Sequence, residues 1–155
     1  MAFDGPARAV VHALKFRGAV GLAGLMAAQM VATAPPGLLA PGVAVVPVPT
    51  PAARRRRRGF DHGARLAAAV AERTGLEVLP CLRRTGAAPR QAGARRAARL
   101  ADGRVQVAVR KPVPSRVALV DDVHTTGATI EACARKLLAN GAFSVVALAY
   151  ARALR

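Results

Sequence analysis

The stretch of sequence that decides the fold runs from Val117 to Thr129 and reads Val-Ala-Leu-Val-Asp-Asp-Val-His-Thr-Thr-Gly-Ala-Thr. Its first four residues are apolar, as is typical of a buried strand, and two adjacent carboxylates, Asp121 and Asp122, follow them directly. A Thr-rich turn then leads into a segment whose apolar residues recur at helical spacing: Ile130, Cys133, Ala134, Leu137 and Leu138. Ligands of open α/β sheets bind at the carboxyl ends of strands, so this order predicts a binding site around the acidic pair.

The turn itself has the chemistry of a monophosphate site. Unpaired N–H groups and the positive end of the dipole at a helix start attract anions, and a glycine lets the backbone approach them closely. The expected phosphate-binding residues are Thr125, Thr126, Gly127, Ala128 and Thr129. Carboxylates repel a phosphate, so the acidic pair suits the hydroxyls of a sugar that carries it, or Mg²⁺ on those hydroxyls. The alternative is a strand that ends in solvated aspartates before an ordinary Thr cap.

The patterns GxxxxGK[ST] and GxGxxG do not occur in the sequence, so neither a P-loop ATPase nor a dinucleotide-binding protein is indicated. After a Pro- and Gly-rich break at residues 35–42, apolar strands alternate with helices, which predicts an α/β fold with a parallel sheet flanked by helices. Strands are expected at 43–48, 78–81, 117–120 and 143–150, and helices at 60–74 and after the Thr-rich turn. We expect residues 1–40 to form a small helical segment and residues 41–155 the α/β core of a single domain.

An uncharged run from Gly18 to Ala34 follows a short basic stretch, so a signal peptide is one interpretation. The run is shorter than the roughly 20 residues of a membrane span, and its apolar residues are spaced as on a buried amphipathic helix, which we favour. Two cysteines without a Cys/His cluster fit a reducing compartment. The expectation is a cytoplasmic protein that is not inserted in a membrane.

The chain has 24 Lys+Arg against 8 Asp+Glu, a formal net charge of +16. Fourteen of these excess charges lie in residues 54–65 and 83–116, and 21 of the 24 basic residues are Arg. Arginine binds phosphate oxygens in pairs, so the distribution indicates polyanionic partners, although biased codon usage is an alternative origin.

On these residues the sequence resembles the type I phosphoribosyltransferases, whose signature is four apolar residues, an acidic pair, two apolar residues and a Thr/Gly-rich turn. Three further segments are similar to the ComF-type, competence-associated branch of that superfamily. They are residues 12–18; Pro47-Val48-Pro49 with Arg58-Gly59-Phe60-Asp61; and Gln91-Ala92-Gly93 with Arg96 and Arg99. The resemblance covers nearly the whole chain, but the four-cysteine zinc module of that branch is missing.

Family members bind 5-phosphoribosyl-1-pyrophosphate with Mg²⁺ and transfer its phosphoribosyl group to an acceptor, releasing pyrophosphate. The resemblance implies that Asp121 and Asp122 hold the ribose hydroxyls and that the Thr-rich turn holds the 5′-phosphate. It implies a pyrophosphate loop with Val48, Pro49, Arg58 and Gly59, and a mobile loop over the site with Arg90, Gln91, Arg95, Arg96 and Arg99. Mg²⁺ would be held mainly through the ligand and water, with the acidic pair as candidate protein ligands.

Some positions depart from the family pattern. Thr125 stands where purine-salvage relatives have an Asp that assists proton transfer, which argues against purine salvage. His124 stands where the signature is apolar; it either packs as a neutral ring behind the turn or accepts a proton in the site. His62 follows Asp61 at a helix start and can approach the pyrophosphate loop. Asp102 stands where the branch usually has Asn.

The resemblance implies a phosphoribosyltransferase whose acceptor is unidentified. The alternative is a competence accessory protein that binds single-stranded DNA without sequence preference through counterion release and uses the phosphoribosyl site for ligand sensing. The sequence leaves open whether the chain forms a homodimer.

Overall fold

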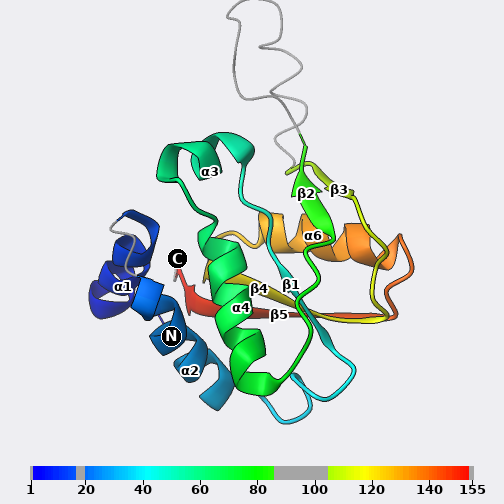
Figure 1. Ribbon diagram of the computed structural model, residues 1–155, viewed down its shortest axis with the longest axis horizontal. Coiled ribbons are helices and arrows are strands. Elements are labelled where there is room, and N and C mark those ends of the chain that lie inside the picture. Colours follow the sequence, from blue (N-terminus) through cyan, green and yellow to red (C-terminus); the bar gives the residue numbers. More distant parts are fainter. Residues whose placement is uncertain (1, 17–19, 86–104, 154–155) are drawn as a thin grey trace, which may run out of the picture.

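The central sheet has three parallel strands in the order β1-β4-β5 (Figure 1). The strands are β1 (Ala44–Pro47), β4 (Arg116–His124) and β5 (Ser144–Arg152). The computed structural model describes residues 2–16, 20–85 and 105–153. In the register of the sheet, Ala44 pairs with Val117, which in turn pairs with Val145. The α/β fold with a parallel sheet flanked by helices is therefore confirmed.

Helices cover both faces of this sheet, as Figure 1 shows. One face carries α1 (Gly5–Phe16), α2 (Val20–Ala32) and α4 (His62–Thr74). The other face carries α6 (Ala128–Leu138) and a small antiparallel hairpin of β2 (Leu82–Arg84) and β3 (Val107–Val109). The short helix α3 (Ala52–Arg58) lies between β1 and α4 in the chain. These layers leave the carboxyl edge of the sheet bordered by α3 and the start of α6.

The alternation of side chains along the strands divides the core into two clusters. Val45 and Val120 face the α4 side, where they join Met26 and Leu66 among buried residues of α2 and α4. Val46 and Leu119 face the other side, and the residues buried there include Val117, Cys81, Cys133 and Leu137. The N-terminal helices share the first cluster through Val11, Leu14 and Met30. Strands that are apolar on both faces thus account for the two helical layers.

Helix α4 ends at Thr74, as its sequence predicts, and begins at His62, two residues after the predicted start. Asp61 is its N-cap, and the Asp61 Oδ1 atom accepts a hydrogen bond from the backbone N–H of Ala64 at 3.2 Å. Gly75 ends the helix in the left-handed conformation, with φ of 70°. The same Asp61 oxygen accepts a hydrogen bond from Thr50 Oγ1 at 3.1 Å, so the cap also holds the segment that follows β1.

Two sequence expectations of local structure were wrong. The predicted strand at 78–81 is reduced to one bridge, Val78 with Val45, because Pro80 lacks an N–H and the N–H of Cys81 turns back to Leu79 O. The arginine run expected as a pyrophosphate loop is the helix α3, since Ala and Arg have high helix propensity and Gly59 ends it at φ of 76°. The sequence analysis also did not predict β3.

Three residues expected in apolar positions are exposed: Leu25, Leu138 and Phe143, which is 85% exposed just before β5. The expected mobile-loop residues Arg90, Gln91, Arg95, Arg96 and Arg99 lie outside the described residues. Within the part of the chain that the structure describes, no helix has the length and apolar character needed to cross a bilayer.

Replacing Asp61 by Ala removes the cap of α4 together with the hydrogen bond from Thr50. We expect Asp61→Ala to lower the free energy of unfolding by about 1–2 kcal/mol, measured by urea denaturation followed by circular dichroism. Asp61→Asn keeps a capping oxygen, so its free energy of unfolding should fall clearly less. Equal stability of the Ala variant and the parent would contradict the capping role.

Candidate functional site

The carboxyl ends of β1 and β4 lie at the same edge of the sheet, but β1 ends before β4 does. Pro47, the last residue of β1, pairs with Val120, and the N–H of Val48 still donates to Val120 O at 2.9 Å. Strand β4 continues through His124, with Asp121 paired to Ala149 of β5. The acidic pair therefore lies within a strand that continues four residues beyond its predicted end at Val120, beside the start of the segment that leaves β1.

Because neighbouring residues of a strand point to opposite faces, the two carboxylates separate. Asp122 is only 4% exposed and faces the α4 side, where its Oδ2 atom lies 3.5 Å from His62 Nε2. Asp121 is half-buried on the α6 side, and its Oδ1 atom accepts a hydrogen bond from the backbone N–H of Asp122 at 2.9 Å. One carboxylate thus lies on each face of the sheet, near its carboxyl edge.

On the α4 side, Asp122 belongs to a chain of polar contacts that reaches α3. Arg58 Nη1 lies 3.1 Å from His62 Nδ1, and His62 is 8% exposed. Burial lowers the pKa of Arg58, and Arg54 lowers it further, whereas the charge of Asp122 acts in the opposite direction. Arg58, an expected pyrophosphate residue, and Asp122, an expected ribose residue, are therefore joined through His62.

On the α6 side, a residue that the sequence analysis did not single out reaches the site. Arg84, at the end of β2, donates a hydrogen bond from Nη1 to Thr129 Oγ1 at 3.4 Å. Burial lowers the pKa of Arg84, and Arg54 lowers it further, whereas the carboxylate of Asp121 acts in the opposite direction. In the sequence, Arg84 is distinguished only by its positive charge. Its hydrogen bond to Thr129 could not be predicted, because it depends on the β2–β3 hairpin. Arg54 and Arg84 bring positive charge to the edge from two different elements.

The turn between β4 and α6 is shaped by a glycine and a histidine. Gly127 has a φ of 79°, and a Cβ atom there would lie 2.9 Å from His124 Nε2. The ring of His124 therefore packs directly against the turn, and among the described residues its buried Nδ1 atom has no hydrogen-bond partner. Thr126 Oγ1 accepts from the N–H of Ala128 at 3.4 Å, where α6 begins. This geometry favours the packing interpretation of His124 over a role as proton acceptor.

The segment after β1 is held close to the start of α4. The backbone oxygen of Val48 lies 3.1 Å from the position that a Cβ atom would take at Gly63, so a larger residue there would push against the segment. Together with the hydrogen bond from Thr50 to Asp61, this contact fixes the expected pyrophosphate residues Val48 and Pro49 relative to α4. Gly59, another expected pyrophosphate residue, ends α3.

Among the described residues, no group of three or more His, Cys, Asp and Glu side chains could hold a metal ion by itself. Mg²⁺ prefers oxygen ligands, retains several waters and is usually bound through one or two carboxylates together with substrate phosphates. The donors present, Asp121 and Asp122, therefore fit an ion that arrives on the oxygens of a phosphorylated ligand.

Both cysteines are buried on the α6 face and behave as packing residues. Burial raises the pKa of Cys133 to about 12, although Arg84 acts against this shift. Burial likewise raises the pKa of Cys81. Both thiols are therefore protonated at neutral pH and are unsuited to nucleophilic chemistry. His12, on α1, is exposed.

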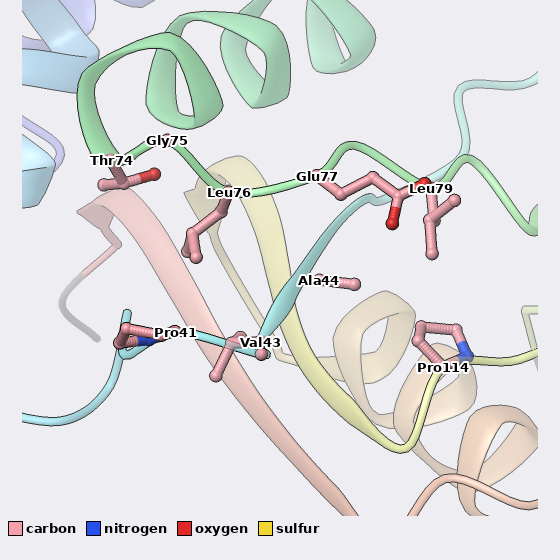
Figure 2. Close-up of a pocket in the computed structure, with 10 residues that line it drawn as sticks. Pro41, Val43, Ala44, Thr74, Gly75, Leu76, Glu77, Leu79 and Pro114 are labelled. Carbon is pink, nitrogen blue, oxygen red and sulfur yellow. The ribbon is translucent and has the colours of Figure 1, made fainter.

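A pocket of about 340 Å³ lies at the opposite, amino edge of the sheet (Figure 2). Its lining comes from the approach to β1, the end of α4 and the segment after it, including Val43, Gly75 and Leu79. Ligands of open α/β sheets bind beyond the carboxyl ends of the strands. The pocket is therefore separate from the candidate site at Asp121 and Asp122.

No family model and no curated protein sequence matches the chain. Among solved structures, the chain is similar to an allosteric regulatory enzyme of purine biosynthesis, with a TM-score of 0.55 and 22% identity over 83% of this chain. It is also similar to a phosphoribosylpyrophosphate synthetase from Mycobacterium smegmatis, with 17% identity over 81% of this chain, but the TM-score of 0.45 is too low to support an argument. The chain spans 25% and 31% of the lengths of these two proteins.

The strand order, the helices on both faces and the first of these likenesses define the class. The chain has an α/β fold with a parallel sheet flanked by helices, as its sequence predicts, and it shares this fold with the regulatory enzyme of purine biosynthesis. The likeness, at this identity, establishes the fold alone.

Two glycines of the chain separate the cost of backbone strain from the cost of the His124 contact. Gly75 and Gly127 have similar positive φ angles, but a Cβ atom at Gly75 would meet nothing within 4 Å. We expect Gly75→Ala to lower the free energy of unfolding by about 1–2 kcal/mol through strain alone. Gly127→Ala should cost measurably more in the same urea denaturation experiment, because His124 must also move. Equal losses would show that the ring does not support the turn.

Proposed function

We propose that the chain binds 5-phosphoribosyl-1-pyrophosphate with Mg²⁺ and transfers its phosphoribosyl group to an acceptor, releasing pyrophosphate. The observation that carries the proposal is the position of the acidic pair. Asp121 and Asp122 lie at the carboxyl edge of the sheet, a few residues before the hydroxyl-rich start of α6. A sugar phosphate needs hydroxyl acceptors and an anion site at that spacing.

In this proposal each predicted residue has a separate task. Asp121 and Asp122 accept hydrogen bonds from the ribose hydroxyls. The 5′-phosphate lies at the start of α6, where the binding groups come from Thr125, Thr126, Gly127, Ala128 and Thr129. Thr125 and Thr126 are exposed and accessible to a ligand, and Gly127 allows a close approach of the backbone.

The pyrophosphate would lie toward α3, at Val48, Pro49, Arg58 and Gly59, with Arg84 facing it from β2. Bond breaking at the sugar leaves positive charge on the ribose and negative charge on the departing pyrophosphate, so catalysis depends on positioning and on neutralising the leaving group. The side chains of Arg58 and Arg84 would supply that positive charge. Mg²⁺, when bound, would add to it on the phosphate oxygens.

The assignment to the ComF-type branch and the role of Arg90, Gln91, Arg95, Arg96 and Arg99 as a mobile loop over the pyrophosphate stay predictions from the sequence. Thr125 cannot act as a general base, so an acceptor that needs no proton transfer to this position is favoured over a purine. Localisation in the cytoplasm is proposed on the same footing.

Isothermal titration of 5-phosphoribosyl-1-pyrophosphate in the presence of Mg²⁺ tests the proposal. The parent should bind, and the double variant Asp121→Asn/Asp122→Asn should bind at least about a hundredfold more weakly, because two hydrogen bonds to charged groups are weakened. Glu131→Gln, which changes an exposed carboxylate on α6, is the control and should bind like the parent. Absence of binding by the parent would refute the proposal.

A second candidate function is sequence-independent binding of single-stranded DNA, with the phosphoribosyl site used for ligand sensing. The observation that favours it is α3, on which Arg54, Arg55, Arg56 and Arg57 are all exposed. A phosphoribosyl ligand can engage few of these side chains at once, whereas a strand of phosphates can engage them together.

Fluorescence anisotropy with a labelled oligothymidine measures this second function. Four phosphate contacts predict that the affinity falls about fiftyfold between about 50 and 200 mM salt. Replacing Arg54 to Arg57 together by Gln should flatten this dependence, whereas Arg135→Gln on α6 should not. Affinity that is independent of salt would exclude DNA binding through α3.

A further inference from the structure

His62 lies between the two parts of the candidate site. It is the first residue of α4, and its side chain is almost completely buried. The Nδ1 atom of His62 is 3.1 Å from Arg58 Nη1, and the Nε2 atom is 3.5 Å from Asp122 Oδ2. A single ring therefore contacts both a predicted pyrophosphate residue and a predicted ribose residue.

The partner at Nδ1 fixes the tautomer of the ring. A guanidinium group has only hydrogen-bond donors, so Arg58 donates and His62 Nδ1 accepts with its lone pair. The proton of the neutral ring is then on Nε2, the nitrogen that faces the carboxylate of Asp122. His62 thus accepts on the side of α3 and presents an N–H on the side of β4.

The backbone holds the ring in this position. Asp61 caps the helix turn from which His62 projects, and the neighbouring Gly63 packs against the backbone oxygen of Val48. Because the backbone is fixed and the side chain is almost completely buried, the ring has little room to turn away from Asp122. A histidine that merely filled the core would not require charged groups of the site at both ring nitrogens.

We propose that His62 is a positioning residue that couples the pyrophosphate side of the site to the ribose side. By holding Arg58 with one nitrogen and orienting the Asp122 carboxylate with the other, it keeps both groups in place before the ligand arrives. The inference rests on the proposed binding of 5-phosphoribosyl-1-pyrophosphate. It assigns His62 no contact with the ligand and no proton transfer.

The tautomer is the first test, and it needs no ligand. In the nitrogen NMR spectrum of the ¹⁵N-labelled protein at neutral pH, His62 should show an unprotonated Nδ1 and a protonated Nε2, assigned by comparison with His62→Gln. A protonated Nδ1 would overturn the proposal, because Arg58 could not then donate to it. In Arg58→Gln the preference for this tautomer should weaken.

Ligand affinity is the second test. His62→Leu keeps an apolar side chain but removes both contacts, and it should bind the ligand about tenfold more weakly, as expected for one lost hydrogen bond to a charged group. His62→Gln offers one acceptor and one donor and should recover much of that loss. His12→Gln, on the exposed surface of α1, is the control and should bind like the parent. Thermal unfolding of each variant confirms that it is folded.

Coupling is the third test. Arg58→Gln should weaken binding less in the His62→Leu background than in the parent, because the bridge is already lost. Additive effects of the two substitutions, or unchanged affinity in a folded His62→Leu variant, would overturn the positioning role while the loss of binding in Asp121→Asn/Asp122→Asn still supported the proposed function. If the parent itself does not bind, the proposed function fails and the positioning role fails with it. The tautomer then still reports whether Arg58 and His62 are in contact.

Discussion

The parallel pairing of β1 with β4 is the constraint on which the rest of the structure depends. Its register places Pro47 beside Val120, so β1 ends where the acidic pair begins. Three parts of the candidate site follow from this register: the segment from Val48 to Thr50, the capped start of α4, and the turn into α6. The buried valines that hold the pairing together face both helical layers, so a change of register would move the acidic residues into the core.

The candidate site has one part on each face of the sheet, and β4 connects the two parts. On the α4 face, Asp122 contacts His62, which contacts Arg58 of α3. On the α6 face, Asp121 lies within the electrostatic reach of Arg84, which donates to Thr129. Each carboxylate therefore has an arginine near it from a different element. This arrangement keeps opposite charges together at an edge with a large excess of positive charge.

The sequence predicted the parts of the fold that depend on local pattern. The strand before Asp121 and the helix between Asp61 and Gly75 follow from apolar runs, caps and glycines, and the structure confirms them. The resemblance to type I phosphoribosyltransferases predicted the class of fold. The contacts of His62 and Arg84 could not be predicted, because they depend on distances between elements that are far apart in the chain. The helix α3 was missed because the resemblance implied a loop at this segment, whereas the backbone preference of Ala and Arg decided its conformation.

The seven residues of α3 have a further consequence. Five consecutive arginines put like charges three and four positions apart on a helix with no buried residue, and each such pair costs a few tenths of a kcal/mol. At its start the N–H of Arg55 donates to Pro51 O, at its end the N–H of Gly59 donates to Arg55 O, and Arg58 contacts His62. An anion placed among these side chains would remove the repulsion, so α3 should become more ordered as negative charge gathers at the edge. The order of the α3 backbone should thus depend on the anions that surround this edge of the protein.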